Sequence, residues 1–117
     1  MPGISLTLLV LKTQQVDRLR AFYQTLGISF VEEQHGKGPL HYAGQTGELT
    51  LEIYPLPAEA AADSTTRLGF VVDNVEEVVE LLQSQGNAAL QGPRQTAWGY
   101  RAMVKDPDGR TVELCQR

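Results

Sequence analysis

The chain has 117 residues, enough for one domain with its own hydrophobic core. Hydrophobic residues make up 42% and charged residues 21% of the sequence, as is typical of soluble globular proteins, and the net charge of -4 argues against nucleic acid as a main partner. The longest apolar stretch is far too short to span a bilayer, no basic segment with a cleavage site precedes it, and the single cysteine, Cys115, cannot form an internal disulfide. We therefore expect a cytoplasmic protein with no membrane partner.

The first half of the chain has the pattern of one strand, one helix and three more strands. Apolar residues at helical spacing begin near Gln14 and end at Gly27, which predicts the helix. In the last strand Glu52 shares one face with Thr50 and Tyr54, because side chains alternate along a strand. The strands are predicted at residues 4–11, 28–33, 40–43 and 49–54.

The second half repeats this order after an aperiodic connector at residues 56–65. Asn74, with Glu77 three residues later, is typical of a helix start, and Gly86 is typical of a helix end. The Asp-Pro-Asp-Gly sequence at residues 106–109 predicts a tight turn before the last strand. The strands are predicted at residues 67–72, 88–90, 100–104 and 111–115, with a turn at residues 92–93.

The two halves are related as an internal repeat. Gly27 and Gly86 lie 59 positions apart, and the mid-strand glutamates Glu52 and Glu113 lie 61 apart, so the modules differ by only two residues. Each half alone would leave one sheet face uncovered. We therefore predict an α+β fold, a single domain over residues 1–117 in which two paired βαβββ modules, at residues 4–55 and 66–116, form a concave mixed sheet.

Several short motifs occur in a fixed order along this repeat. They are Phe22-Tyr23, Leu26-Gly27, the strand around Glu52, Val72-Asp73-Asn74, Trp98-Gly99, the Asp-Pro-Asp-Gly turn and Glu113-Leu114. Together they resemble the vicinal oxygen chelate superfamily, which includes glyoxalase, bleomycin resistance proteins and extradiol dioxygenases. The resemblance implies a glyoxalase-like fold that binds a small-molecule ligand or substrate, usually as a homodimer in which modules from two chains complete each cavity.

The resemblance also implies where a metal ion would bind. Metal-dependent members place one ligand on the first strand of each module and a carboxylate on the outer strand, which corresponds here to Leu8, Glu52, Arg67 and Glu113. Leucine has no donor atom, and arginine is always protonated and offers no lone pair. We therefore expect a degenerate metal site and no cofactor, with a weakly bound divalent ion held by the two glutamates as the alternative.

Arg67 has two interpretations. It is either a cavity cation that binds an anionic oxygen of the substrate, or a structural ion pair with Glu52 and Glu113, and we favour the ion pair. Two facing carboxylates disfavour each other's charged form, and a guanidinium relieves that repulsion. If the site is dry, removal of Arg67 is expected to cost roughly 3–5 kcal/mol.

The remaining candidates are cavity residues. Glu52 and Glu113 are candidate general bases, although this role is weaker without a metal. His41, on the third predicted strand, is a candidate pocket residue, whereas His35, beside a glycine, is expected in a loop. If Tyr100 and its alternate neighbours pack on the helix, the residues between them face the cavity. The expected cavity-wall residues are Tyr54, Trp98, Arg101 and Met103, with Trp98 either a ligand-stacking lid or a hydrophobic plug.

The sequence is compatible with three functions. The first is a small-molecule-binding protein without a conventional metal site, similar to the bleomycin resistance members that sequester cationic drugs. The alternative is an enzyme, a lyase, isomerase or dioxygenase, that either recruits a metal through Glu52 and Glu113 or uses Arg67 as an electrophile. A purely structural role is a third reading.

Overall fold

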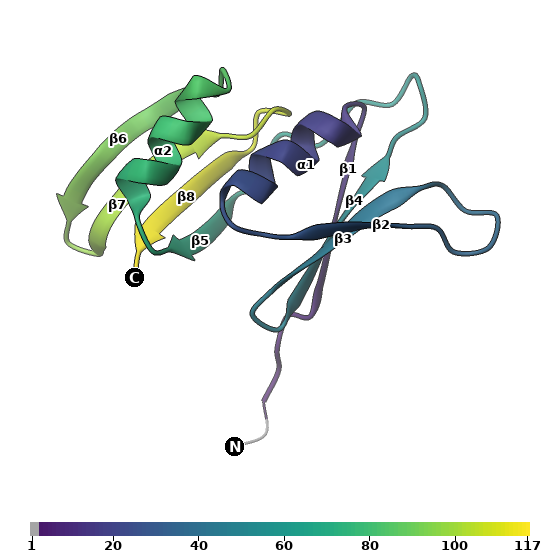
Figure 1. Cartoon of the computed structure of the whole chain (residues 1–117), viewed down its shortest axis with the longest axis horizontal. Helices are drawn as coiled ribbons and strands as arrows, with labels where there is room; N and C mark the ends of the chain where they lie inside the picture. The colour runs from purple at the N-terminus through teal and green to yellow at the C-terminus, as the bar shows by residue number, and fades with distance from the viewer. Residues whose placement is uncertain (1–2) are drawn as a thin grey trace. The chain divides into compact units, whose positions relative to one another are not determined.

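The computed structural model describes residues 3–117, in which the order βαβββ occurs twice (Figure 1). The first module consists of β1 (Leu8–Thr13), α1 (Val16–Thr25), β2 (Phe30–Glu33), β3 (His41–Thr46) and β4 (Leu49–Pro55). The second consists of β5 (Leu68–Val72), α2 (Val75–Ser84), β6 (Ala89–Thr96), β7 (Gly99–Lys105) and β8 (Thr111–Gln116). The expected α+β fold of two βαβββ modules is confirmed.

Each module forms its own four-stranded mixed sheet. Sheet A has the order β1-β4-β3-β2 and sheet B the order β5-β8-β7-β6. The first strand of each module runs parallel to the last, and the other neighbours are antiparallel. In the second module α2 packs against β6, β7 and β8 (Figure 1). Each sheet therefore has one face toward its helix and one face away from it, which we call the open face.

The strand register confirms the internal repeat. Val10 of β1 lies opposite Glu52 of β4, and Gly69 of β5 lies opposite Glu113 of β8. The first-strand residues are 59 positions apart and the glutamates 61, as the sequence repeat requires. Glu52 and Glu113 are therefore structural equivalents.

Both helices form where the sequence predicts them. The side chain of Asn74 accepts a hydrogen bond from the backbone N–H of Glu77 at 3.0 Å, the expected N-cap of α2. The helices bury apolar residues at helical spacing, namely Leu19, Phe22 and Tyr23 in α1 and Val75, Val79 and Leu82 in α2. Within residues 3–117, neither helix is long and apolar enough to cross a membrane.

Two predictions about the strands are wrong. Residues 4–7 are not part of β1, and Ile4 is 98% exposed, because β4, the strand that pairs with β1 within residues 3–117, begins at Leu49. The predicted turn at residues 92–93 lies inside β6, where the register shifts between Ala89 and Gln91 and again between Gln91 and Arg94. Pro93 has no N–H to pair, and an edge strand such as β6 tolerates this as a bulge. The chain instead reverses after Thr96.

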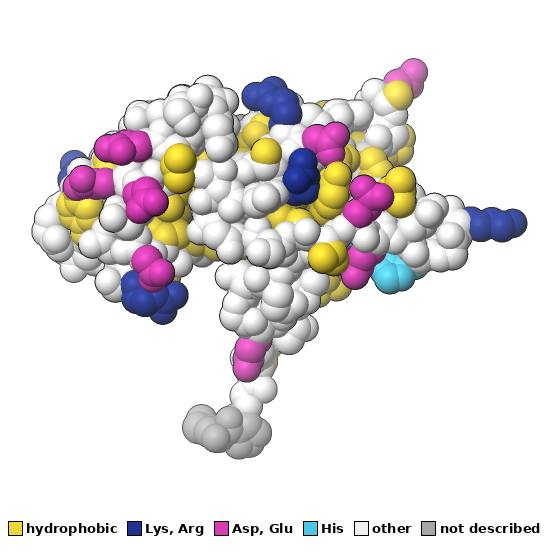
Figure 2. Space-filling view, in the orientation of Figure 1, with side chains coloured by type: hydrophobic (Ala, Val, Ile, Leu, Met, Phe, Trp, Pro, Cys, Tyr) yellow, Lys and Arg dark blue, Asp and Glu magenta, His cyan; other side chains and the backbone are white. Residues whose placement is uncertain are grey.

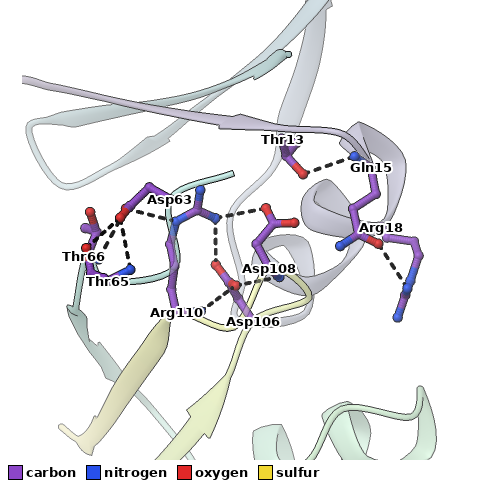
Figure 3. A network of polar contacts seen from close by, with 9 residues as sticks. All are labelled: Thr13, Gln15, Arg18, Asp63, Thr65, Thr66, Asp106, Asp108 and Arg110. Carbon is purple, nitrogen blue, oxygen red and sulfur yellow. Dashed lines mark hydrogen bonds and ion pairs between the residues drawn. The ribbon is translucent and has the colours of Figure 1, made fainter. Parts of the chain in front are cut away.

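The Asp-Pro-Asp-Gly turn is present and is anchored by an arginine that the sequence did not single out. Arg110 is 1% exposed, and its Nη1 donates hydrogen bonds to Asp106 at 3.1 Å and Asp108 at 3.0 Å, while its Nε lies 3.7 Å from Asp63 (Figure 3). Burial alone would lower the pKa of Arg110, but the hydrogen bond and charge of Asp106, with those of Asp108, raise it overall. This network fixes the start of β8 and hence the position of Glu113.

Candidate functional site

The open face of sheet A carries a cavity. On the opposite face the Tyr42 hydroxyl donates a hydrogen bond to Asp17 of α1 at 2.9 Å, so the alternate residues of β3 face away from the helix. The cavity has a volume of about 380 Å³. It is lined by Ser29, Val31, Glu33, Ala43, Gly44, Gln45, Thr50 and Glu52.

Gly44 is required at the cavity floor. A Cβ atom at this position would lie 2.6 Å from Cγ2 of Ile28 and 2.9 Å from the carbonyl oxygen of Ser29. Both contacts are shorter than van der Waals packing allows, so β2 can approach β3 this closely only at a glycine.

His41 is the centre of the polar groups beside this cavity. Its ring stacks on Tyr54, with the ring centroids 4.0 Å apart and an angle of 9° between the planes. Its Nε2 lies 3.5 Å from Oε1 of Glu33 and 3.8 Å from Oε2 of Glu52. Burial raises the pKa of Tyr54, and the negative charges of Glu52 and Glu33 raise it further. His41, Tyr54 and Glu52 are thus brought together, but of these three only Glu52 lines the cavity, and a ligand-binding role for His41 and Tyr54 stays a prediction.

The open face of sheet B is organised around Glu113. The Tyr100 hydroxyl donates a hydrogen bond to Glu76 of α2, so Arg101 and Met103 face away from the helix, as predicted. Nη2 of Arg101 lies 2.8 Å from Oε1 of Glu113. The second partner of this carboxylate is Arg67.

The structure revises the expected role of Arg67. Its Nη2 donates a hydrogen bond to Glu113 at 3.1 Å and lies 3.6 Å from the sulfur of Met103, whereas the group beside the carboxylate of Glu52 is the His41 ring, with Nε2 at 3.8 Å. The Arg67 side chain is 57% exposed, so the pair is not dry. The buried-pair cost of roughly 3–5 kcal/mol therefore does not apply, and about 0–1 kcal/mol is expected instead.

The residues at the expected metal position do not fit a metal ion. Leu8 lies opposite Thr50 in the sheet register and contributes only hydrocarbon. Arg67 places a guanidinium on Glu113, and Arg101 adds a second one. Both groups carry fixed positive charge and no lone pair, and both contact Oε1 of Glu113, so they compete with a metal ion for that oxygen.

The structure also gives the positions of Trp98, Glu33 and His35. Trp98 is 78% exposed after β6, so it does not plug a core. Glu33 lines the cavity but was not predicted, although alternation with Val31 along β2 places both residues on the same face. His35 lies in the turn after β2, as expected, yet its Nε2 is 3.6 Å from Glu33.

The chain matches a known protein family over almost its whole length. Residues 5–114 match the Glyoxalase/Bleomycin resistance protein/Dioxygenase superfamily. The chain belongs to this superfamily. The resemblance drawn from the short motifs is therefore confirmed over almost the whole sequence.

Individual members of the superfamily are distant relatives. An uncharacterized protein from Mycolicibacterium smegmatis is 26% identical over 102 residues, which cover 87% of this chain and 84% of that protein. An antibiotic-binding protein from a Streptomyces species is 26% identical with a TM-score of 0.75, covering 99% of this chain and 98% of its own. A glyoxalase I mutant from Zea mays is 20% identical with a TM-score of 0.79, covering 96% of this chain but 44% of the maize protein, and this similarity shows the fold alone.

Proposed function

We propose that this superfamily member binds a small molecule in the cavity on the open face of sheet A. The observation that carries the proposal is the composition of this cavity, in which two carboxylates, Glu33 and Glu52, stand beside an apolar floor that includes Val31 and Ala43. Its volume of about 380 Å³ lies within the range of small-molecule sites.

The lining defines the chemistry of the ligand. Glu52 is largely buried, so its carboxylate has lost part of its hydration and gains from a cation or a strong hydrogen-bond donor. Val31 and Ala43 offer contact for an apolar body. The ligand is therefore amphipathic and carries a cationic group, which agrees with the net charge of -4. The similar Streptomyces protein, which binds an antibiotic, supports this class of ligand.

The usual metal of the superfamily has no role in this proposal. Of the four residues that the resemblance assigns to a metal, Leu8 and Arg67 offer no donor atom, which leaves only Glu52 and Glu113. The alternative function, a lyase, isomerase or dioxygenase that uses both glutamates, has less support, because a general base must be free to accept a proton. Glu113 is already held by two guanidinium groups.

We also propose that the protein is a homodimer. The strands at one edge of each sheet, β1 and β5, carry exposed apolar side chains, including Leu8, Val10 and Val71. Exposed apolar edges favour association with another chain, and a second copy offers the same surfaces. Size-exclusion chromatography with light scattering should give twice the mass of the 12.9 kDa chain, and a monomer at micromolar concentration would exclude the dimer.

The binding proposal is tested by a thermal-shift screen of chelator-treated protein. The library contains antibiotics and metabolites in pairs of similar size, one member cationic and the other neutral or anionic. Calorimetry on the strongest cationic hit should show that Glu52→Gln weakens binding about tenfold or more, as expected for a charged hydrogen bond of roughly 1.5–3 kcal/mol. Glu32→Gln is the matched control, because Glu32 lies opposite Tyr42 on the helix-facing side of β2. A preference for anions, or equal affinity in both variants, would refute the proposal.

A further inference from the structure

Both histidines of the chain converge on one glutamate at the end of the β2–β3 hairpin. Nε2 of His35 lies 3.6 Å from Oε1 of Glu33, and Nε2 of His41 lies 3.5 Å from the same oxygen. One ligand atom from each of the three residues lies within 4.8 Å of the others. Figure 2 shows histidine atoms at the surface beside acidic side chains next to this hairpin. Neither histidine lies at the superfamily's metal position.

The buried histidine has a ring nitrogen that no hydrogen bond satisfies. The His41 side chain is 1% exposed, and its Nδ1 lies 3.2 Å from the carbonyl oxygen of Pro39. Because that carbonyl can only accept, Nδ1 carries the hydrogen, and Nε2 of the neutral ring presents a lone pair. Nε2 is buried without a hydrogen-bond partner. A buried polar atom in this state is costly unless another group binds it.

The distances suit a metal ion shared by these groups. In a tetrahedral site with metal–ligand bonds of about 2.0–2.2 Å, the ligand atoms lie roughly 3.3–3.6 Å from one another. The two nitrogen–oxygen distances, 3.6 Å and 3.5 Å, fall at this spacing. They are too long for good hydrogen bonds. Two of the three separations thus match those around a shared ion, and the third, between a nitrogen of each imidazole, is within 4.8 Å.

We propose that Glu33, His35 and His41 form a binding site for a divalent metal ion of the zinc type. Two imidazole nitrogens with a carboxylate oxygen suit zinc, cobalt or nickel, whereas magnesium and calcium prefer oxygen ligands alone. Glu52, with Oε2 3.8 Å from Nε2 of His41, supplies a further carboxylate at the same point. The hydrogen bond from Nδ1 of His41 to Pro39 orients the ring, as partners of metal-bound histidines commonly do.

The local backbone positions the ligands. Glu33 and His41 are opposite one another on paired strands, so their spacing is fixed by the sheet. His35 lies in the following turn, where its carbonyl accepts a hydrogen bond from the N–H of Gly38 at 3.0 Å. Gly36 makes the turn possible with a φ of 59°. Two ligands are thus rigid, and the exposed third one can close over the ion.

The test uses untagged, chelator-treated protein titrated with zinc chloride in a calorimeter. Wild type should bind one ion per chain. His35→Ala and Glu33→Gln should each weaken zinc binding at least about tenfold. Replacing a residue that only supports a metal ligand already lowers metal affinity by about this factor, so loss of a ligand itself should lower it at least as much. Glu32→Gln, which removes a carboxylate from the other face of β2, should leave the affinity unchanged. His35 is exposed in a turn, so its replacement is not expected to impair folding.

Nuclear magnetic resonance gives a second readout. The chain has 2 histidines, so both imidazoles can be followed, and zinc should shift the Nε2 signals of both while the Nδ1 proton of His41 persists. Absence of zinc binding, unchanged affinity in His35→Ala, or an unshifted His41 would overturn the site. The small-molecule proposal is tested on metal-free protein through Glu52→Gln, so the two proposals can fail separately.

Discussion

Glu52 and Glu113 occupy equivalent positions in the two sheets, but the residues around them differ. His41 and Arg101 occupy corresponding positions on the third strand of each module. His41 lies two residues before Ala43, which pairs with Glu52, and Arg101 lies two residues before Met103, which pairs with Glu113. Next to them in the register lie Glu33 in sheet A and Arg94 in sheet B. One open face thus surrounds its glutamate with an imidazole and a second carboxylate, and the other surrounds it with guanidinium groups.

The helix-facing sides of the two sheets are more alike. Asp17 and Glu76 hold the same position in the two helices, 59 residues apart, and each accepts a hydrogen bond from a tyrosine of the third strand. The repeat therefore retains its chemistry where the helix packs and differs on the open faces. The partners of each carboxylate therefore decide its function, because Glu113 is neutralised within its module whereas Glu52 can accept an external cation.

The largest effect is expected from Arg110, the buried cation of the second module. Arg110→Met leaves Asp106 and Asp108 buried without their partner and should lower the free energy of unfolding by about 3–5 kcal/mol. Arg110→Lys retains the positive charge but lacks the planar guanidinium group, so its free energy of unfolding should lie between those of wild type and Arg110→Met. Urea denaturation measures both. The control is Arg117→Met, because Arg117 forms an exposed pair with Asp73. Equal losses in Arg110→Met and Arg117→Met would show that the network does not support the fold.

A smaller effect is expected from the guanidinium groups on Glu113. Arg67→Ala should cost about 0–1 kcal/mol of unfolding free energy, because the pair is exposed and screened by solvent. Arg101 is less exposed and lies closer to Glu113, so Arg101→Ala should cost more than Arg67→Ala. Denaturation at low and high salt should show both losses shrink as salt increases. A loss from Arg67→Ala as large as that from Arg110→Met would restore the buried-pair interpretation.

The smallest effect concerns the tyrosines on the helix-facing sides. The hydrogen bond with Asp17 raises the pKa of Tyr42, and the hydrogen bond with Glu76 raises the pKa of Tyr100. Because the folded state holds these protons more tightly, the stability contribution is complete below a pH of about 10 and is lost as the pH rises through the folded pKa. Asp17→Asn and Glu76→Gln should each move tyrosine ionisation, followed by ultraviolet absorbance, to lower pH. If the ionisation curves of the variants superimpose on that of wild type, the hydrogen bonds of Tyr42 with Asp17 and of Tyr100 with Glu76 are contradicted.

The sequence predicted the fold well because the signals of the fold are local. The glycines that end the helices, the Asn74 cap and the alternation around Glu52 each act within a few residues, and the repeat adds independent support. The two wrong strand predictions, at residues 4–7 and 92–93, concern features that are determined by the neighbouring strand in the sheet. Pairing partners are distant in sequence, so local patterns could not decide them.

The candidate site was predictable only in part. The facing of Arg101 and Met103 follows from strand alternation, and the loss of donors at Leu8 and Arg67 follows from the resemblance. The partners of each side chain could not be predicted, because they depend on sheet register. Glu33 becomes significant only once β2 places it opposite His41, and Arg110 only once the hairpin folds around its guanidinium.

We propose that ligands bind on the open face of sheet A. Amide chemical shifts of metal-free protein, titrated with the strongest cationic compound from the screen, test this most directly. We predict shifts concentrated in β2, β3 and β4, around Ala43 and Glu52, and their loss in Glu52→Gln. Shifts concentrated in β7 and β8, around Arg101 and Glu113, would contradict the account.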